Sequence, residues 1–210
     1  EETTVLGQSW EEQSYVGVSR YTIQQQGFYN DGANRSNAAL INPGASKVLC
    51  FAPEGGVIGD LFIGSPLVQA TYVRQISRGA LHKANATYQS EGQHDEGVIL
   101  HALGAETGDD GDTEDDSVDS GASSAAGGAG YLQVTALTLG GYDDVSFAVS
   151  HSADDSTFVD LVTFVDVASA PNAQRVAVSG TVNRYLASNY EFNGSGSTQS
   201  VTYMIGFARY

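Results

Sequence analysis

Gly97-Val-Ile-Leu-His-Ala-Leu-Gly104 reads as a short apolar strand, and Tyr131-Leu-Gln-Val-Thr-Ala-Leu137 begins another. Between them, residues 105–130 contain almost no large apolar side chain, and eight carboxylates crowd residues 106–119. A segment of this composition cannot form a core of its own. The sequence therefore predicts two β-rich halves joined by an acidic, glycine-rich strap (residues 104–130), which we expect to be docked on neighbouring surfaces.

In the first half, the pattern of apolar and turn residues predicts several strands and one short helix. The alternation of apolar and polar residues over 16–28 is typical of a half-buried strand. Asp31 is a candidate N-cap for a helix over 33–41, which Pro43-Gly44 ends. Residues 67–77 and 80–89 flank Arg78-Gly79 and predict a hairpin. Further short strands are expected at 47–52 and at 57–63, the latter ending before Gly64-Ser-Pro66.

The second half predicts an antiparallel β-sandwich, because short strand patterns alternate with turn residues. The expected strands are 131–139, 145–151, 157–165, 173–179, 184–192 and 200–208. The fold class is therefore mainly β, with no internal repeat between the halves. The predicted division is an N-terminal β domain (1–103, including an extended arm at 1–14), an acidic connector (104–130) and a C-terminal sandwich (131–210).

Charge excludes one class of partner. The chain has 25 acidic and nine Lys or Arg residues, a net charge of −16 and a sequence pI of about 4.3. Binding of nucleic acid through phosphate neutralisation is therefore not expected. Scarce lysine and widespread carboxylates favour a halophilic source, in which salt screens the repulsion, over an ordinary acidic surface.

Cysteine and hydropathy add two negative results. The lone Cys50 lies in an apolar run, which excludes an internal disulfide framework and favours a small buried side chain over a nucleophile. No window has the length of apolar sequence that a membrane span requires, and no signal-peptide pattern is present. Because the chain begins at Glu1, we expect that an upstream piece has been removed or lies outside it.

Motifs for catalysis or metal binding are weak. A Ca²⁺ loop starting at Asp112 would place Glu114 and Asp116 correctly, but Ser117 replaces the turn glycine and Ser123 the terminal glutamate. The four histidines lack zinc-pair spacing, and His94-Asp95-Glu96 is interpreted as a polar turn. No nucleophile elbow, phosphate loop or HExxH run occurs. We therefore predict no catalytic, cofactor-binding or metal residue, no cofactor and no enzyme activity.

One pattern has two interpretations. The run His151-Ser-Ala-Asp-Asp-Ser-Thr-Phe-Val-Asp-Leu161, followed by Asn183-Arg-Tyr-Leu-Ala187, resembles the galactose-binding-like sandwiches. The alternative, which we favour, makes the Asp-rich run a turn and pairs Arg184 with a carboxylate. No exposed aromatic cluster for stacking on a sugar is evident in the sequence.

A more specific match spans both halves. Its segments are Gly97-Val-Ile-Leu-His-Ala-Leu-Gly-Ala-Glu-Thr107, Gly127-Gly-Ala-Gly-Tyr-Leu-Gln-Val-Thr-Ala136, Ser150-His-Ser-Ala-Asp154, Gln174-Arg-Val-Ala-Val-Ser-Gly-Thr-Val-Asn-Arg-Tyr-Leu186, Gly206-Phe-Ala-Arg209 and, more loosely, Tyr21 to Ala33 around Gly27-Phe-Tyr-Asn-Asp-Gly32. Together they resemble the tail tube (major tail) proteins of viruses with long, non-contractile tails. The strap is longer and more acidic than this resemblance leads us to expect.

The resemblance implies a structural role. Residues 1–103 would be a tail-tube-like sandwich or barrel that forms six-membered rings, the rings would stack into a tube, and 131–210 would be an outer sandwich. Expected partners are other copies, other tail proteins and viral DNA that passes through the lumen without specific binding, with no membrane. The expected location is the virion tail, after assembly in the host cytoplasm. The alternatives are a virion surface, capsid-decoration or glycan-binding module and, third, an enzyme or unrelated secreted protein.

Overall fold

The fold is mainly β, as the sequence predicts. The computed structural model describes residues 22–32, 37, 40–41, 43–44, 46–76, 78–79, 81–90, 92 and 94–210. The predicted arm at 1–14 lies outside these residues. The strands are β1 (Thr22–Phe28), β2 (Ser46–Phe51), β3 (Leu61–Gln75), β4 (Lys83–Ser90), β5 (Asp95–Glu106), β6 (Asp110–Asp112), β7 (Val118–Asp119), β8 (Gly128–Thr138), β9 (Asp144–Ser152), β10 (Val159–Thr163), β11 (Asn172–Val178), β12 (Tyr185–Asn193) and β13 (Ser200–Arg209).

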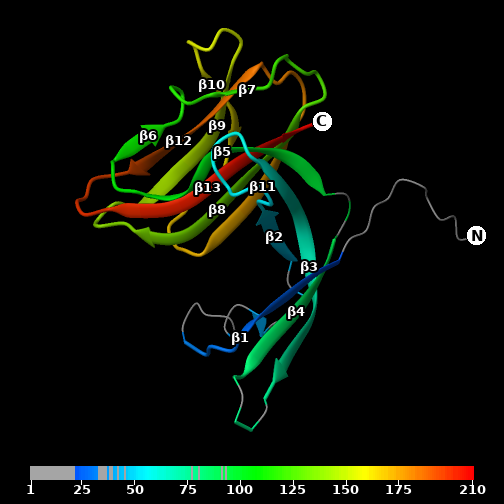
Figure 1. Ribbon diagram of the computed structural model, residues 1–210. Coiled ribbons are helices and arrows are strands. Elements are labelled where there is room, and N and C mark those ends of the chain that lie inside the picture. The colour runs from blue at the N-terminus through cyan, green and yellow to red at the C-terminus, as the bar shows by residue number, and fades with distance from the viewer. Residues whose placement is uncertain are drawn as a thin grey trace, which may run out of the picture.

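The strands form two antiparallel sheets (Figure 1). The larger sheet has the order β1-β4-β3-β5-β13-β8-β11, with β2 on the free side of β3, and the smaller sheet has the order β10-β9-β12-β6, with β7 also paired to β12. The part of the larger sheet from β5 to β11 faces the smaller sheet. This confirms the predicted antiparallel sandwich in the second half.

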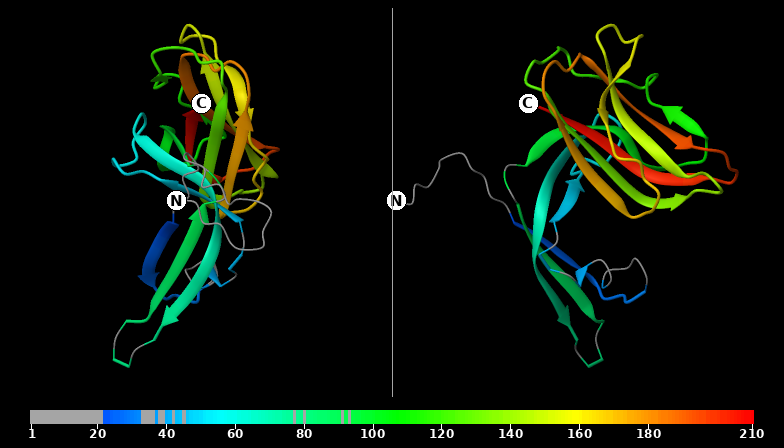
Figure 2. Two further views of the ribbon diagram at one scale, coloured as in Figure 1. Left: turned by 90° about the vertical axis from the view of Figure 1, so that its right-hand side faces the viewer. Right: turned by 180° about the vertical axis from the view of Figure 1, so that it is seen from behind.

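The first half extends the larger sheet instead of closing a barrel of its own among the described strands. β3 pairs with β5 through residues 61–64 and then continues outward, where residues 67–75 pair with β4. β1 pairs with the other edge of β4. Figure 2 shows the resulting projection reaching away from the sandwich. It consists of β1, β4 and residues 67–75 of β3 and is called the arm from here on; it is distinct from the N-terminal arm predicted at residues 1–14.

Three apolar clusters hold these parts together. The largest fills the sandwich, with Phe147 and Tyr190 from the smaller sheet packed on Tyr203 of β13. A small one lies under the arm, where Leu67 and Tyr88 pack on Leu40. The third joins the two regions and includes Phe62, Tyr131 and Met204. The arm is therefore packed against a small core of its own and tied to the sandwich by a shared one.

Gly64 is essential to the junction. A Cβ at this position would lie 2.6 Å from the Tyr131 ring, so only glycine lets β3 approach β8 this closely. This contact explains why Gly64-Ser-Pro66, expected to end a strand, does not do so. The two strands predicted at 57–63 and 67–77 are a single strand, β3, because Pro66 lies opposite Val48 on the side of β3 that β2 covers.

Of the remaining predicted elements, the strands are confirmed and one turn is wrong. The hairpin of β3 and β4 is confirmed, as are the six strands of the second half, to within about three residues at their ends. In the predicted helix, the described residues Asn37 and Leu40 are helical and Ile41 forms a bend, whereas 33–36 and 38–39 lie outside the described residues. The predicted polar turn at His94-Asp95-Glu96 is wrong, because β5 begins at Asp95. No described helix is long and apolar enough to cross a bilayer.

Strand pairing crosses the expected domain boundaries. Residues 95–103 belong to β5, which pairs with β13 near the end of the chain. The expected connector 104–130 contains β6, β7 and the beginning of β8. The division into three domains remains a prediction, but the sandwich uses residues from all three parts.

Candidate functional site

The acidic strap is docked on the smaller sheet, as predicted. β6 pairs with residues 189–191 of β12, and β7 pairs with Tyr185 and Leu186 of the same strand. At its far end, Asp119 accepts two hydrogen bonds of 2.6 Å from Arg184, whose guanidinium lies over the Tyr185 ring. Arg209 donates to the carbonyl of Ala122. Backbone pairing and two cations thus compensate for the scarcity of apolar side chains in the strap.

A glycine sits where the strap crosses the sandwich core. A Cβ on Gly111 would lie 2.6 Å from Cε1 of Tyr190, so the glycine allows β6 to lie directly on that ring. The side chain of Val118 packs against the main cluster. Gly111 therefore has a packing role in the strap.

The strap's carboxylates are in two electrostatic states. The hydrogen bonds from Arg184, with a further one from the backbone of Gly121, lower the pKa of Asp119 to about 2. Desolvation and then the charges of Asp112 and Asp115 raise the pKa of Glu114. One end of the strap is therefore neutralised by a cation, whereas the middle is under like-charge repulsion.

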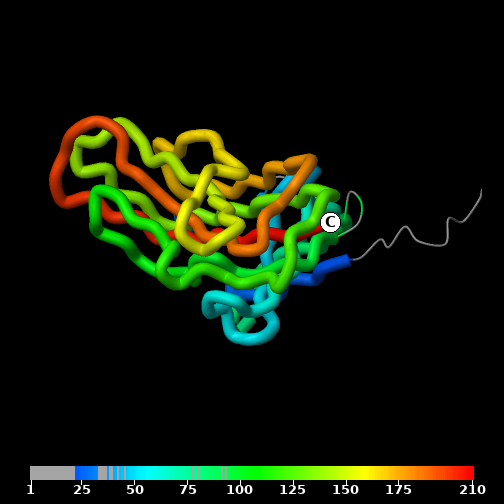
Figure 3. Tube along the Cα trace, turned by 90° about the horizontal axis from the view of Figure 1, so that it is seen from above, coloured from blue at the N-terminus to red at the C-terminus, as the bar shows by residue number. Residues whose placement is uncertain are grey.

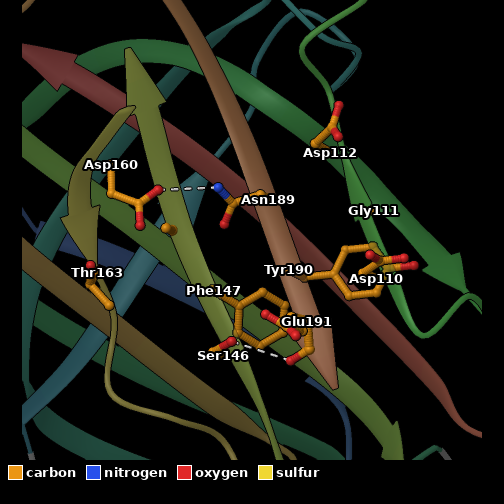
Figure 4. A pocket seen from close by; sticks show the side chains of 11 residues that line it. Asp110, Gly111, Asp112, Ser146, Phe147, Asp160, Thr163, Asn189, Tyr190 and Glu191 are labelled. Atoms are coloured by element: carbon orange, nitrogen blue, oxygen red, sulfur yellow. Dashed lines mark hydrogen bonds between the residues drawn. The ribbon is translucent and has the colours of Figure 1, made fainter. Parts of the chain in front are cut away.

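A polar cleft lies beside the strap on the smaller sheet (Figure 4). Its volume is about 380 Å³, and its lining includes the carboxylates of Asp110, Asp112, Asp160 and Glu191. On its floor, Asn189 Nδ2 donates to Ser150 Oγ at 2.9 Å and to Asp160 Oδ1 at 3.3 Å.

These groups are mainly hydrogen-bond acceptors, which suits a hydroxylated or cationic ligand. Phe147 and Tyr190 also line the cleft, but both rings are buried in the sandwich core. The cleft's lining therefore offers polar recognition without an exposed aromatic face for stacking. The sequence did not predict this cleft, because its residues come from four strands that only the sheet order brings together.

The histidines are dispersed among the described residues. His101 stacks on Tyr203 with ring centroids 3.9 Å apart, and its Nε2 lies 3.4 Å from Glu106. His151 Nδ1 accepts a hydrogen bond from the backbone of Asn183. No group of three or more metal-ligating side chains gathers in the part of the chain that the structure describes. Asp112 and Glu114, which the weak Ca²⁺-loop pattern includes, lie in the strap. There the Asp112 carboxylate accepts a hydrogen bond from the backbone NH of Glu114.

The Asp-rich run near residue 154 is a turn, which confirms the favoured interpretation. Asp154 accepts hydrogen bonds from the backbone NH of Thr157, from the Ser152 hydroxyl and from the backbone NH of Ser156, and these bonds lower its pKa to about 2. Arg184 pairs with a carboxylate, that of Asp119, as expected. The residues behind the galactose-binding-like resemblance therefore have structural partners.

Sequence reasoning missed a buried polar network at the junction. Arg175 of β11 lies 2.7 Å from Asp95 of β5, and Tyr131 donates to the same carboxylate at 2.5 Å. The Asp95 side chain is only 9% exposed. This network joins β5, β8 and β11, so it fixes the strands that carry the arm relative to the sandwich.

Cys50 packs near this junction, and burial raises the pKa of its thiol to about 12. This agrees with the prediction that Cys50 is an unreactive apolar side chain.

The end of the arm carries several large apolar side chains that are exposed to solvent. Ile76 and Leu81 at the end of its hairpin are 71% and 73% exposed. Val73 and Phe28 are also largely exposed nearby. Large apolar side chains gathered at the end of a projecting sheet are typical of an interaction surface.

Comparison with known proteins gives little. No protein-family model and no curated protein matches the chain. Among solved structures, the K1 cleaved adhesin domain of Lys-gingipain from Porphyromonas gingivalis W83 is similar at 12% sequence identity, over 90% of this chain and 99% of that chain. The TM-score is 0.28, so this likeness carries no argument about function.

Proposed function

We propose that this chain is a self-assembling structural subunit of a virus tail tube. The observation that carries the proposal is the arm, which continues the sheet beyond the sandwich and ends in exposed Ile76 and Leu81. Burying each of these side chains against another copy would contribute about 1.5–3 kcal/mol. The resemblance of the sequence to tail tube proteins supplies the form of the assembly, six-membered rings that stack.

Edge strands support the same function. β1 is the last described strand at one end of the larger sheet, and β11 is the last at the other. Strand edges are pairing surfaces, and subunits of closed assemblies use them between copies. In this proposal the sandwich lies on the outside of the tube, and viral DNA passes through without specific binding because the acidic protein repels phosphate.

Electron microscopy of the purified full chain tests the proposal. The sample is examined at molar salt and again at about 0.1 M salt, where the Debye length is roughly 10 Å. Rings or tubes with six-fold symmetry are expected in at least one condition. Dispersed monomers at every salt and protein concentration would rule it out.

The polar cleft favours a second candidate, a virion surface module that binds glycans. Asn189 and Asp160 form a paired amide and carboxylate of the kind that binds vicinal hydroxyls. A glycan screen tests it, with Asp160→Ala as the variant expected to lose binding. The full chain is the proper sample, because a fragment beginning at residue 131 lacks β5. An empty screen, or equal binding by the variant, would count against this candidate.

A further inference from the structure

Charge is unevenly divided along this acidic chain. Residues 61–90 contain no Asp or Glu, although the net charge of the chain is −16. The same segment holds three cations, Arg74, Arg78 and Lys83, all near the turn of the β3–β4 hairpin. None of the three forms an ion pair with a described residue, whereas Arg175 and Arg184 in the sandwich do. The hairpin tip, defined as the described residues 73–76, 78–79 and 81–83, is thus basic and, through Ile76 and Leu81, apolar.

A groove on the sandwich has the opposite charge and a similar apolar content. It runs between the turn that precedes β3 and the middle of the strap, and Figure 3 shows this turn (cyan) projecting beside the strap (green). Its apolar lining comes from Val57, Ile58, Ala102 and Val118, and its acidic lining from Asp115 and Asp116. Val57 is 61% exposed.

Among the described residues, no cation forms an ion pair with Asp115 or Asp116 on the acidic side of the groove. The described cations of the sandwich are engaged elsewhere, with Arg184 on Asp119 and Arg209 on backbone carbonyls. The raised pKa of neighbouring Glu114 reflects burial and the charges of Asp112 and Asp115. A basic group placed here would relieve this repulsion.

We propose that the hairpin tip of one copy docks in this groove of a second copy. Ile76 and Leu81 would pack on Val57 and Ile58, while Arg78 would lie beside Asp115 and Asp116. This inference rests on the proposed self-assembly and names the two surfaces that meet.

The contact is between copies, because the tip and the groove lie on separate parts of one molecule (Figures 1 and 2). Two different patches meet in such a contact, so it is head-to-tail and can repeat from copy to copy. A head-to-tail contact excludes a two-fold dimer, and in this proposal it links one ring to the next.

Charge reversal tests the pairing. Arg78→Glu and Asp116→Arg are each expected to weaken end-to-end association of the full chain about tenfold at about 0.1 M salt, because like charges then face each other. The chain that carries both changes is expected to regain association, since the opposite charges meet again. Sedimentation velocity and electron microscopy measure the length of the assemblies.

Matched controls reverse charges outside both surfaces. Lys47→Glu and Asp166→Arg change the net charge equally and are expected to leave association unchanged. Circular dichroism checks that every variant is folded. Ile76→Ser with Leu81→Ser gives an independent test, which is expected to shorten the assemblies even at molar salt, where charge effects are screened.

The outcomes separate this inference from the function on which it rests. If the unaltered chain forms no rings or tubes, the proposed function fails. If it assembles, but the single reversals have no effect or the double change does not restore stacking, the docking inference fails and the function stands. If Arg78→Glu instead abolishes binding to an added DNA duplex and leaves stacking intact, the tip is a nucleic-acid contact and the inference is overturned.

Discussion

Gly111 shows how one residue allows a segment with few apolar side chains to pack on the sandwich. The strap has almost no apolar side chain, yet its backbone lies on the Tyr190 ring, because Gly111 leaves room for it. Asp95 has a similar importance at the junction, where its carboxylate receives both Arg175 and Tyr131. Composition explains why the strap is solvated, but only the position of Tyr190 explains why a glycine is needed at residue 111.

Replacing Gly111 with alanine is expected to destabilise the fold by about 1–3 kcal/mol, because the new Cβ would require the Tyr190 ring to move. Urea unfolding of the two proteins measures the difference. Gly92→Ala is the control, since a Cβ at that position has no atom within 4 Å. Equal midpoints for Gly111→Ala and the parent would show that the strap does not pack on Tyr190.

Asp95→Asn is expected to cost about 2–4 kcal/mol, because it leaves the partly buried Arg175 without its counter-charge. Asp119→Asn removes a carboxylate from an ion pair whose side chains are more than 40% exposed, so a much smaller loss is expected. Thermal unfolding at neutral pH compares the two. A larger loss for Asp119→Asn would reverse this ranking.

Among the elements, the longer strands were largely predictable, whereas the two short strands of the strap, β6 and β7, were not. Alternating apolar residues and turn residues predict β8 to β13 because each strand has one face in the core. β6 and β7 lack that pattern, since they are short, polar and held by the backbone of β12. Likewise, the oxygen-rich cleft gathers residues such as Asp110 and Asp160 that lie far apart in sequence, so no local pattern could reveal it.

The strap is expected to loosen in acid in a defined order. The folded-state pKa of Asp119 is about 2, below its ordinary value, so its contribution to stability is complete above about pH 4 and is lost as the pH falls toward 2. The raised pKa of Glu114 acts in the opposite direction, since its protonation relieves repulsion before Asp119 is protonated. Amide hydrogen exchange of residues 118–121 measures this, and Asp119→Asn should abolish the transition near pH 2–4. Exchange that rises first near neutral pH would contradict this order.

At the scale of the whole molecule, β5 connects regions that the sequence separates. β5 pairs with β3 of the arm on one side and with β13 of the sandwich on the other. Apolar patterning predicts that residues 97–104 form a strand but does not give its partners, because pairing with residues some hundred positions away leaves no local signal. The predicted boundary at residue 103 therefore follows composition, whereas the sheet passes through it.

A fragment of residues 131–210 is expected not to fold, because it lacks β5 and leaves one edge of β13 unpaired. A fragment of 94–210 keeps β5 to β13 and is expected to fold. Near-ultraviolet circular dichroism and amide dispersion in NMR distinguish the two. A folded 131–210 fragment would support the three-domain division instead.

The central place of β13 also sets the order in which the molecule can form during translation. This strand is inserted between β5 and β8, and its Val201 lies opposite Glu106, so the larger sheet stays divided until residues 200–209 have been made. Until then both neighbouring edges are exposed to other nascent chains, and such long-range pairing is slow. The growing chain is therefore most vulnerable to misassembly just before β13 is inserted.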